Sequence, residues 1–292
     1  MYRTVKPFIK WAGGKSQLLD KIREKYPERI EKYCEPFVGG GAVLLDILAN
    51  FQVKDVLIND INPELINAYN QIRDNVDDIV GLLTETQEVY WSMGSEQRKA
   101  FFYTKRNRFN ELIQESADTI EKAALFIFIN KTCFNGLYRV NAKGLYNVPI
   151  GEYKKPPICD TENLRTISTM LKGVQIKCGN YSECKNFIDK NTFVYIDPPY
   201  RPLSDTSSFT SYAKTEFGDE EQIQLGRFIN EMAEKGAKIV ASNSDPKNTD
   251  VNDNFFDDIY KHFSISRIKA TRMINSKSSG RGSVNELLIC NF

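Results

Sequence analysis

The segment FVYIDPPY, residues 193–200, decides the fold of this chain. Four apolar or aromatic residues precede an acid, two prolines and a tyrosine, which is typical of a buried parallel strand that ends where proline removes a backbone donor. Ligands bind at the carboxyl ends of such strands in open α/β sheets. There Asp197 and the carbonyl oxygen of Pro198 can accept two N–H bonds, while Tyr200 can stack on a planar ring. The segment predicts a site for an amino-bearing ring, although alone it also fits an ordinary strand-to-loop turn.

Composition is typical of a globular protein, because 41% of the 292 residues are hydrophobic and 26% are charged. No apolar run approaches about 18 residues and the N-terminus lacks an apolar signal region, so we expect a cytoplasmic protein without a membrane span. The six cysteines are scattered and His262 is the only histidine, so we expect reduced thiols and no metal site. For His262, a structural or surface role is the simpler interpretation, which argues against Ser-His-Asp and Cys-His mechanisms.

Two glycine-containing turns precede this strand in the chain. The first, PFIKWAGGKS (residues 7–16), ends like a phosphate-binding P-loop, but Ile9 stands where that motif needs glycine. Its glycine pair still lets a ligand approach the backbone, with Trp11 and Lys15 on either side. The second, EPFVGGGAVLLDIL (residues 35–48), predicts a strand, a glycine turn and a helix whose N-terminus can face a ligand.

Asp60 ends the next predicted strand, DVLIND (residues 55–60), about 20 residues after Gly39. An acid at this spacing commonly binds ribose hydroxyls. The dinucleotide fingerprint is incomplete, because Leu44 stands where its third glycine belongs, and this favours an adenosine-like ligand. A helix N-cap is the alternative role for Asp60, but Asn62 can supply that cap while Asp60 binds a ligand.

Residues 77–131 change the pattern, because apolar residues recur at helical spacing and Lys and Arg are frequent. We interpret residues 76–159 as an inserted, mostly helical domain. It interrupts a discontinuous catalytic domain formed by residues 1–75 and 160–292. In that second part we expect helices at 161–171 and 218–235, strands at 174–178, 237–243, 263–267 and 286–292, and a polar loop at 201–217 as a candidate lid.

The insertion ends in a predicted β-hairpin at about residues 137–149, with Arg139 and Lys143 near its tip. A two-stranded ribbon fits the major groove of DNA, where arginine is the best reader of guanine. Net charge is only +1, but three separate basic runs, one of them interleaved with aromatic residues, suit a phosphate backbone with bases to stack on. A purely structural hairpin is the alternative.

These motifs, in this order, resemble the Dam family of DNA adenine-N6 methyltransferases over nearly the whole chain. The resemblance is carried by IKWAGGK (9–15), EPFVGGG (35–41), Asn59-Asp60, DPPY (197–200) and Ser242-Asn243. It implies an α/β fold with a Rossmann-like sheet and helices on both faces. It also implies S-adenosylmethionine as the cofactor and S-adenosylhomocysteine as its product. The implied partner is double-stranded DNA, methylated at adenine N6 in GATC after the base is flipped. We expect a monomer or weak dimer. If the enzyme belongs to a restriction–modification pair, a cognate restriction endonuclease is expected in the same cell.

The same resemblance implies roles for individual residues. Catalysis is expected from Asp197, Pro198 and Tyr200. Cofactor binding is expected from Trp11, Lys15, Phe37, Gly39, Asp60, Asn180 and Asp197. DNA binding is expected from Lys10, Phe134, Asn135, Leu137, Arg139, Pro149, Tyr153 and Lys154. Among these, Arg139 is expected to read guanine, Leu137 to contact a base edge and Phe134 to fill the stack that the adenine leaves.

The chain departs from the family pattern at two of these positions. Phe134 replaces a tyrosine of some relatives, which keeps the ring but removes a hydroxyl group. Asn180 replaces an acid of some relatives and can accept only through its amide oxygen. Two other functions stay open: DPPY also serves enzymes that methylate cytosine N4, and a catalytically inactive DNA-binding regulator would retain the same fold.

Overall fold

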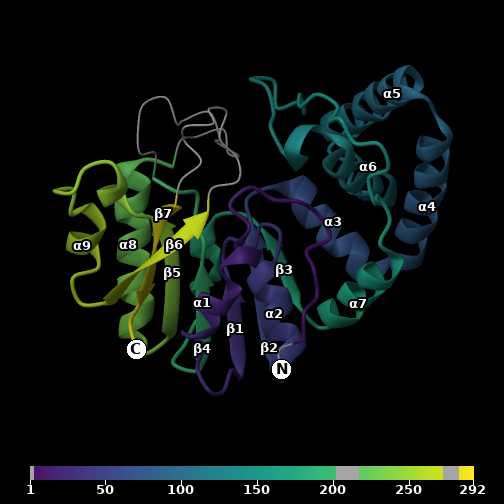
Figure 1. Cartoon of the computed structure of the whole chain (residues 1–292). Coiled ribbons are helices and arrows are strands. Elements are labelled where there is room, and N and C mark those ends of the chain that lie inside the picture. The colour runs from purple at the N-terminus through teal and green to yellow at the C-terminus, as the bar shows by residue number, and fades with distance from the viewer. Residues whose placement is uncertain (1–2, 202–216, 272–282) are drawn as a thin grey trace. The chain divides into compact units, whose positions relative to one another are not determined.

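The computed structural model describes residues 3–201, 217–271 and 283–292 (Figure 1). Within them, seven strands form one mixed sheet in the order β3-β2-β1-β4-β5-β7-β6. Parallel pairing joins β1 to β2 and β4, and β4 to β5, whereas β7 is antiparallel to both β5 and β6. The strands are β1 (Lys32–Glu35), β2 (Asp55–Asp60), β3 (Gln175–Cys178), β4 (Thr192–Ile196), β5 (Lys238–Ser244), β6 (Ser264–Thr271) and β7 (Ser283–Cys290). The expected α/β fold with a sheet and helices is confirmed.

Strand β4 lies in the interior of the sheet, and all five of its residues are buried. The side chains of Phe193 and Tyr195 are among the largest that the protein removes completely from water. Burying one such side chain contributes about 1.5–3 kcal/mol, so the register of β4 against β1 and β5 is strongly fixed. The strand stops at Ile196, so Asp197 stands at its carboxyl end, as the sequence predicts.

Two compact units are formed by discontinuous parts of the chain. The first comprises Met1–Gly14, Gly39–Asn50 and Asn59–Gly179, and the second comprises Lys15–Val38, Phe51–Ile58 and Asn180–Phe292. Helices of the first unit are α2 (Ala42–Asn50), α3 (Pro63–Asp74), α4 (Val76–Ser92), α5 (Ser95–Gln114), α6 (Ile120–Thr132) and α7 (Thr161–Leu171). Those of the second are α1 (Leu19–Arg23), α8 (Asp219–Glu234) and α9 (Phe255–Ile259). The functional division at residues 76 and 159 stays a prediction.

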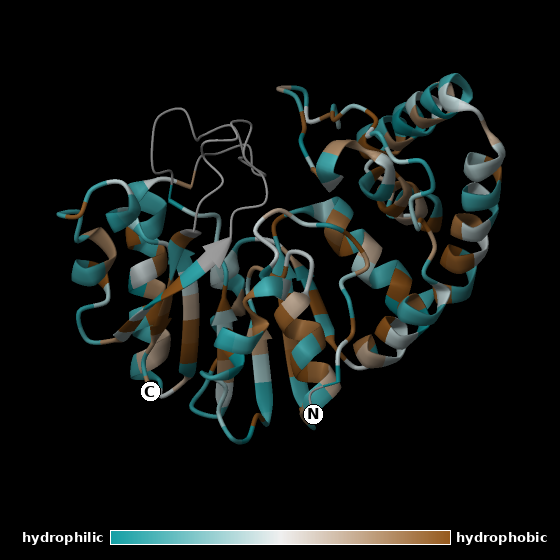
Figure 2. Ribbon diagram, viewed as in Figure 1, coloured by the Kyte–Doolittle hydropathy of each residue, from teal (hydrophilic) through white to brown (hydrophobic). Residues whose placement is uncertain are grey.

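The core of the first unit is aromatic. Helix α6 is buried along almost its whole length, from Lys122 to Asn130, and it packs against α3, α4 and α5. Its Phe128 meets Tyr90 of α4 with ring centroids 5.6 Å apart. Helices α4 and α5 cover this core with only part of their residues. Figure 2 shows apolar and polar residues mixed along both helices. The helical interpretation of residues 77–131 is confirmed.

In the second unit, α8 runs beside β5, and α9 precedes β6 (Figure 1). His262 lies exposed in the turn between α9 and β6, which agrees with a surface role. The candidate lid at 201–217 lies outside the described residues except for its ends, Arg201 and Phe217. No helix that the structure describes is long and apolar enough to cross a bilayer.

The segment predicted as a hairpin, residues 137–149, is described throughout and contains a single antiparallel bridge, between Val140 and Tyr146. Asn141 N donates to Leu145 O at 2.9 Å, and Gly144 N donates to Asn141 O at 2.8 Å. These bonds close a tight antiparallel loop at residues 137–149 without two regular strands. Its side-chain anchors, described below, replace the ladder that a full hairpin would have.

Candidate functional site

Asp197, at the carboxyl end of β4, is held by two groups of the second unit. Lys15 Nζ lies 2.8 Å from Asp197 Oδ1, and Ser242 Oγ donates to the same oxygen at 2.8 Å. Lys15 is only 4% exposed and Asp197 19% exposed. Charge-assisted bonds of this kind are short and directional, so they fix the orientation of the carboxylate. A carboxylate has about four lone-pair sites, which leaves Asp197 capacity to accept an N–H bond from a ligand.

Tyr200 is fixed at its hydroxyl end. Its Oη donates to Glu286 Oε2 of β7 at 2.7 Å, and Lys15 Nζ lies 4.7 Å from the ring centroid. Burial raises the pKa of the Tyr200 hydroxyl well above its usual value, and the Asp197 and Glu286 carboxylates raise it further. The phenol therefore stays protonated and donating, while its ring remains half-buried beside Asp197.

A buried amide pair holds the backbone that connects these residues. Gln222 of α8 is completely buried, and its Nε2 donates to Pro199 O at 2.9 Å. Its Oε1 accepts from Asn243 Nδ2 at 3.0 Å, and Asn243 Oδ1 accepts from Arg201 N at 3.3 Å. The sequence interpretation missed Gln222, although a glutamine on the otherwise apolar face of α8 was a usable signal.

Gln222→Met is expected to lower the free energy of unfolding by about 1–3 kcal/mol, because the Pro199 carbonyl and the Asn243 amide lose their buried partner. Urea unfolding monitored by circular dichroism measures this change. Gln224→Met, an exposed position on the same helix, is the matched control and should stay within about 0.5 kcal/mol of wild type. Equal stability of the two variants would contradict the assigned role of Gln222.

Phe37 and Asn180 also lie in the second unit. Phe37 stacks on Tyr181, with ring centroids 5.3 Å apart and planes inclined by 30°. Asn180 is exposed, and its Oδ1 accepts from Ser182 N at 2.9 Å at the start of the short helix η3 (Tyr181–Cys184). The amide oxygen predicted to face a ligand therefore already caps a turn, and its spare lone pair is what a ligand could use.

The first unit contains the glycine turn and Asp60. Gly39 N donates to Asp60 Oδ2 at 3.0 Å, and Asn62 N donates to Oδ1 at 3.0 Å. Asn62 caps α3 by accepting from Leu65 N at 2.9 Å, so Asp60 is not the cap. Burial raises the pKa of Asp60, against the lowering effect of the N–H donors from Asn62, Gly39 and Ile61. Each carboxylate oxygen keeps lone pairs that suit hydroxyl donors.

Trp11 packs directly on this turn. Gly39 has a φ of +48°, and a Cβ there would stand 2.9 Å from Trp11 Cδ1. A Cβ at Gly40 would stand 3.1 Å from Trp11 Cβ. The absence of side chains at the turn thus lets the indole lie against its backbone. The structure brings Trp11, Gly39 and Asp60 together, and their binding of one ligand stays a prediction.

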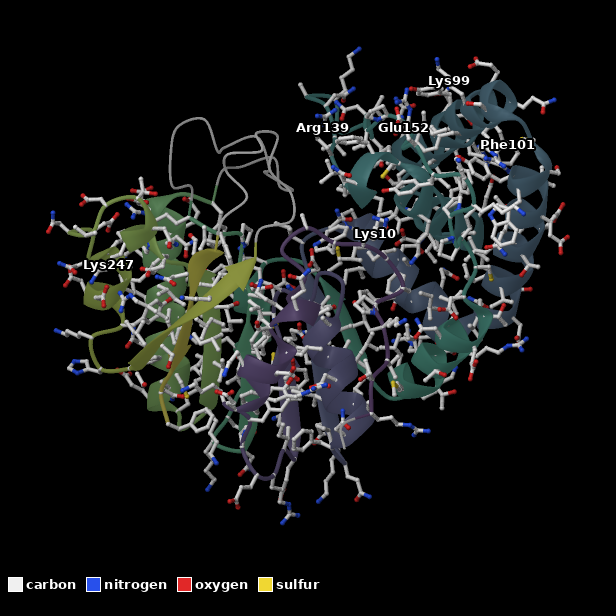
Figure 3. All side chains as sticks on the ribbon, in the orientation of Figure 1. Lys10, Lys99, Phe101, Arg139, Glu152 and Lys247 are labelled. Atoms are coloured by element: carbon white, nitrogen blue, oxygen red, sulfur yellow. The ribbon has the colours of Figure 1, made fainter. Side chains whose placement is uncertain are left out.

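Residues predicted to bind DNA are largely exposed on the first unit. Lys10 Nζ lies 3.4 Å from Tyr153 Oη and 4.5 Å from the centre of its ring. Phe134 is 51% exposed, and its N–H donates to Pro149 O at 2.9 Å. The labelled side chains of Lys99, Arg139 and Glu152 project from this unit in Figure 3. Asn135 and Lys154 are exposed as well, whereas Leu137 is half-buried.

Arg139 is anchored within the loop at residues 137–149. Its Nε donates to Asn147 Oδ1 at 2.8 Å, and Asn147 N donates to Arg139 O at 3.0 Å. Asn110 of α5 holds the other side of the loop, since its Nδ2 donates to Tyr146 O at 3.1 Å and its Oδ1 accepts from Tyr146 N at 2.8 Å. The guanidinium group is therefore exposed to solvent, and its bond to Asn147 restricts its orientation.

Comparison with known proteins decides the family. Residues 11–274 match the model of the D12 class N6 adenine-specific DNA methyltransferases. The chain belongs to this family. A type II methyltransferase of Methanocaldococcus jannaschii, M.MjaIII, is 45% identical over 99% of both chains. The DNA adenine methylases of Haemophilus influenzae and Escherichia coli K12 are 34% and 33% identical, over 97% and 96% of this chain and 92% and 93% of theirs.

A D12-class methyltransferase transfers a methyl group to adenine N6 of DNA, so the predicted enzyme class and its DNA substrate are confirmed. The family acts on adenine N6, which argues against cytosine N4 methylation, the first of the two alternatives. Among the described residues, no group of three or more His, Cys, Asp or Glu side chains could hold a metal ion.

Proposed function

We propose that this methyltransferase moves the methyl group of S-adenosylmethionine to adenine N6 in GATC, after the adenine has left the DNA stack. The observation that carries the proposal is the Asp197 carboxylate, oriented by Lys15 and Ser242 beside the ring of Tyr200. These contacts supply an acceptor and a stacking face for one flipped base.

The chemistry of the amino group explains the residues. Adenine N6 is a poor nucleophile because its lone pair is delocalised into the ring. Asp197 and the Pro198 carbonyl, by accepting its two hydrogens, favour the pyramidal form whose lone pair can attack. Positive charge develops on N6 as the new bond forms, and the fixed carboxylate stabilises it. S-adenosylmethionine would supply an electrophilic methyl group on its sulfonium and would leave as S-adenosylhomocysteine, and the proton that the methylated N6 gives up would pass to water.

The residues proposed for the cofactor fit its chemistry. Asp60 offers carboxylate lone pairs to ribose hydroxyls, and the Gly39 turn presents backbone where side chains would intrude. Trp11 and Phe37 offer apolar and aromatic surface. We assign S-adenosylmethionine binding to Trp11, Lys15, Phe37, Gly39, Asp60, Asn180 and Asp197.

Gly39→Ala is expected to weaken S-adenosylhomocysteine binding by about tenfold or more, since its Cβ would push the Trp11 indole away and its φ is positive. Isothermal titration without DNA measures this affinity. Gly81→Ala, a glycine of α4 whose Cβ would meet no atom, is the matched control and should bind as wild type does. Unchanged affinity in Gly39→Ala would remove the glycine turn from the cofactor site.

We propose that residues 76–159 form the target-recognition domain, and that the loop at residues 137–149, which we call the recognition loop, takes the place of the predicted hairpin. Arg139 reads guanine in the major groove, Leu137 contacts a base edge, and Asn135 and Pro149 contact the same site. The exposed ring of Phe134 fills the space that the flipped adenine leaves. Lys10, Tyr153 and Lys154 contact the DNA around it.

The biological setting is proposed from the relatives. M.MjaIII and M1.LlaDCHI, which is 37% identical over 99% of this chain, are both named type II methyltransferases. We therefore propose that this enzyme, a monomer or weak dimer in the cytoplasm, protects DNA beside a restriction endonuclease of the same specificity.

Transfer of a labelled methyl group to short duplexes tests this function. A duplex with one GATC should accept label from S-adenosylmethionine, and a duplex in which GATC is changed to GTTC should not. A duplex carrying 2-aminopurine at the target adenine should gain fluorescence on binding, because the base leaves the stack. Equal labelling of both duplexes would contradict the target, and constant fluorescence would contradict base flipping.

A further inference from the structure

Asn130, near the end of α6, joins two segments of the first unit that the proposed function treats separately. Its side chain is 3% exposed. Its Nδ2 donates to Lys10 O at 2.8 Å and to Gly136 O at 3.0 Å, while its Oδ1 accepts from Lys10 N at 2.8 Å. One buried amide thus holds the backbone beside Trp11 and the backbone beside Phe134.

A close backbone approach reinforces this link. Gly136 has a φ of +64°, and a Cβ there would stand 2.6 Å from Lys10 Cβ. The turn Phe134–Gly136, which forms the short helix η2, therefore lies directly on the Lys10 side chain. A shift of either backbone by a few tenths of an ångström must move the other.

A third contact, made by Tyr138, also links the N-terminal segment to the segment that follows α6. The Tyr138 ring lies 5.8 Å from the Trp11 ring, and its Oη donates to Glu64 Oε2 at 2.9 Å. Glu64 is buried in the first turn of α3, just after Asp60. Trp11, proposed to bind the cofactor, is thereby in ring contact with Tyr138, which stands between Leu137 and Arg139 in the chain, and Tyr138 is bonded to the helix that follows Asp60.

We propose that Asn130 is a positioning residue that couples cofactor binding to DNA recognition. A cofactor that orders Trp11 orders the Lys10 backbone, and Asn130 passes that order to the Phe134–Gly136 turn. The coupling is reciprocal, so the duplex strengthens cofactor binding by the same factor. This inference rests on the proposed function, because it takes its cofactor and DNA residues from there.

The test is a linkage measurement on the full chain. The Kd of a GATC duplex is measured with and without S-adenosylhomocysteine, which occupies the site without reacting. The ratio of the two values is the coupling factor, about 5- to 150-fold for a typical coupled pair of sites. The Kd of S-adenosylhomocysteine with and without the duplex must give the same factor.

Asn130→Ala should bring the coupling factor close to one while each ligand alone still binds. Asn130→Asp has nearly the same shape but loses both Nδ2 bonds, so it carries the test if the alanine variant does not fold. Asn67→Ala is the matched control, because Asn67 is an equally buried amide of the same unit whose Nδ2 donates to Thr119 O, outside both segments, and it should leave the factor unchanged.

The outcomes separate the inference from the function on which it rests. A wild-type factor near one, or an Asn130→Asp variant that keeps the full factor, would overturn the coupling. If the wild-type protein bound S-adenosylhomocysteine but showed no preference for the GATC duplex over the GTTC duplex, that result would instead count against the proposed recognition site. If Asn130 had only a structural role, its substitution would raise the Kd of both ligands and leave the coupling factor unchanged.

Discussion

Asp197→Asn is expected to lower the single-turnover rate of methyl transfer by about 10³-fold, with little change in duplex affinity. Asparagine keeps the size of the side chain, but it removes the negative charge that Lys15 pairs with and that stabilises charge on the reacting nitrogen. Its amide also presents N–H donors towards an amino group that needs acceptors. Rapid-quench measurement with saturating S-adenosylmethionine and a GATC duplex gives the rate.

Asp258→Asn is the matched control for this experiment, because Asp258 is an exposed carboxylate of α9 in the same unit. It should transfer methyl groups at the wild-type rate. An Asp197→Asn variant within a few-fold of wild type would remove Asp197 from the catalytic site. If Asp197→Asn lost duplex affinity to the same extent as its methyl-transfer rate, the residue would act in DNA binding and not in catalysis.

Arg139→Ala is expected to reduce the preference for GATC over a duplex with its guanine replaced by about 10- to 100-fold, which corresponds to about 1–3 kcal/mol. Arginine donates two bonds to guanine O6 and N7, and Arg139 is the only arginine of the recognition loop. Because Asn147 already holds the guanidinium group, little conformational entropy is lost when it binds. Competition binding with the two duplexes measures the preference.

Lys143→Ala removes the same charge from the exposed turn of the recognition loop. It should weaken both duplexes to a similar degree and lessen the salt dependence of binding, as expected for a phosphate contact. If Arg139→Ala behaved in the same way, Arg139 would be a phosphate contact and the guanine would be read elsewhere.

The strands and helices could be predicted because their patterns are local. The apolar run before Asp197, followed by two prolines, predicts the buried strand that the structure has, and the helix at 161–171 begins and ends at the predicted residues. The roles of neighbouring polar residues could also be separated, since Asn62 caps α3 and Asp60 does not. Short-range chemistry decided each of these features.

Contacts between distant residues could not be predicted in the same way. The ion pair of Lys15 with Asp197 and the bond from Tyr200 to Glu286 join positions far apart in the chain. Neither periodicity nor spacing encodes them. The hairpin prediction is wrong in its strands and right in its turn. Asn110 and Asn147 hold this loop by side-chain bonds, whereas the sequence pattern predicts a ladder of backbone bonds between two strands.

The central claim is that this enzyme methylates adenine N6 in GATC through the Asp197 site. The most direct measurement incubates the protein and S-adenosylmethionine with a random-sequence duplex library and then maps each modified base by sequencing. The account predicts N6-methyladenine at the adenine of GATC, and its loss when Asp197→Asn replaces the wild-type protein. Modified adenines outside GATC, or methyl transfer that persists in Asp197→Asn, would contradict it.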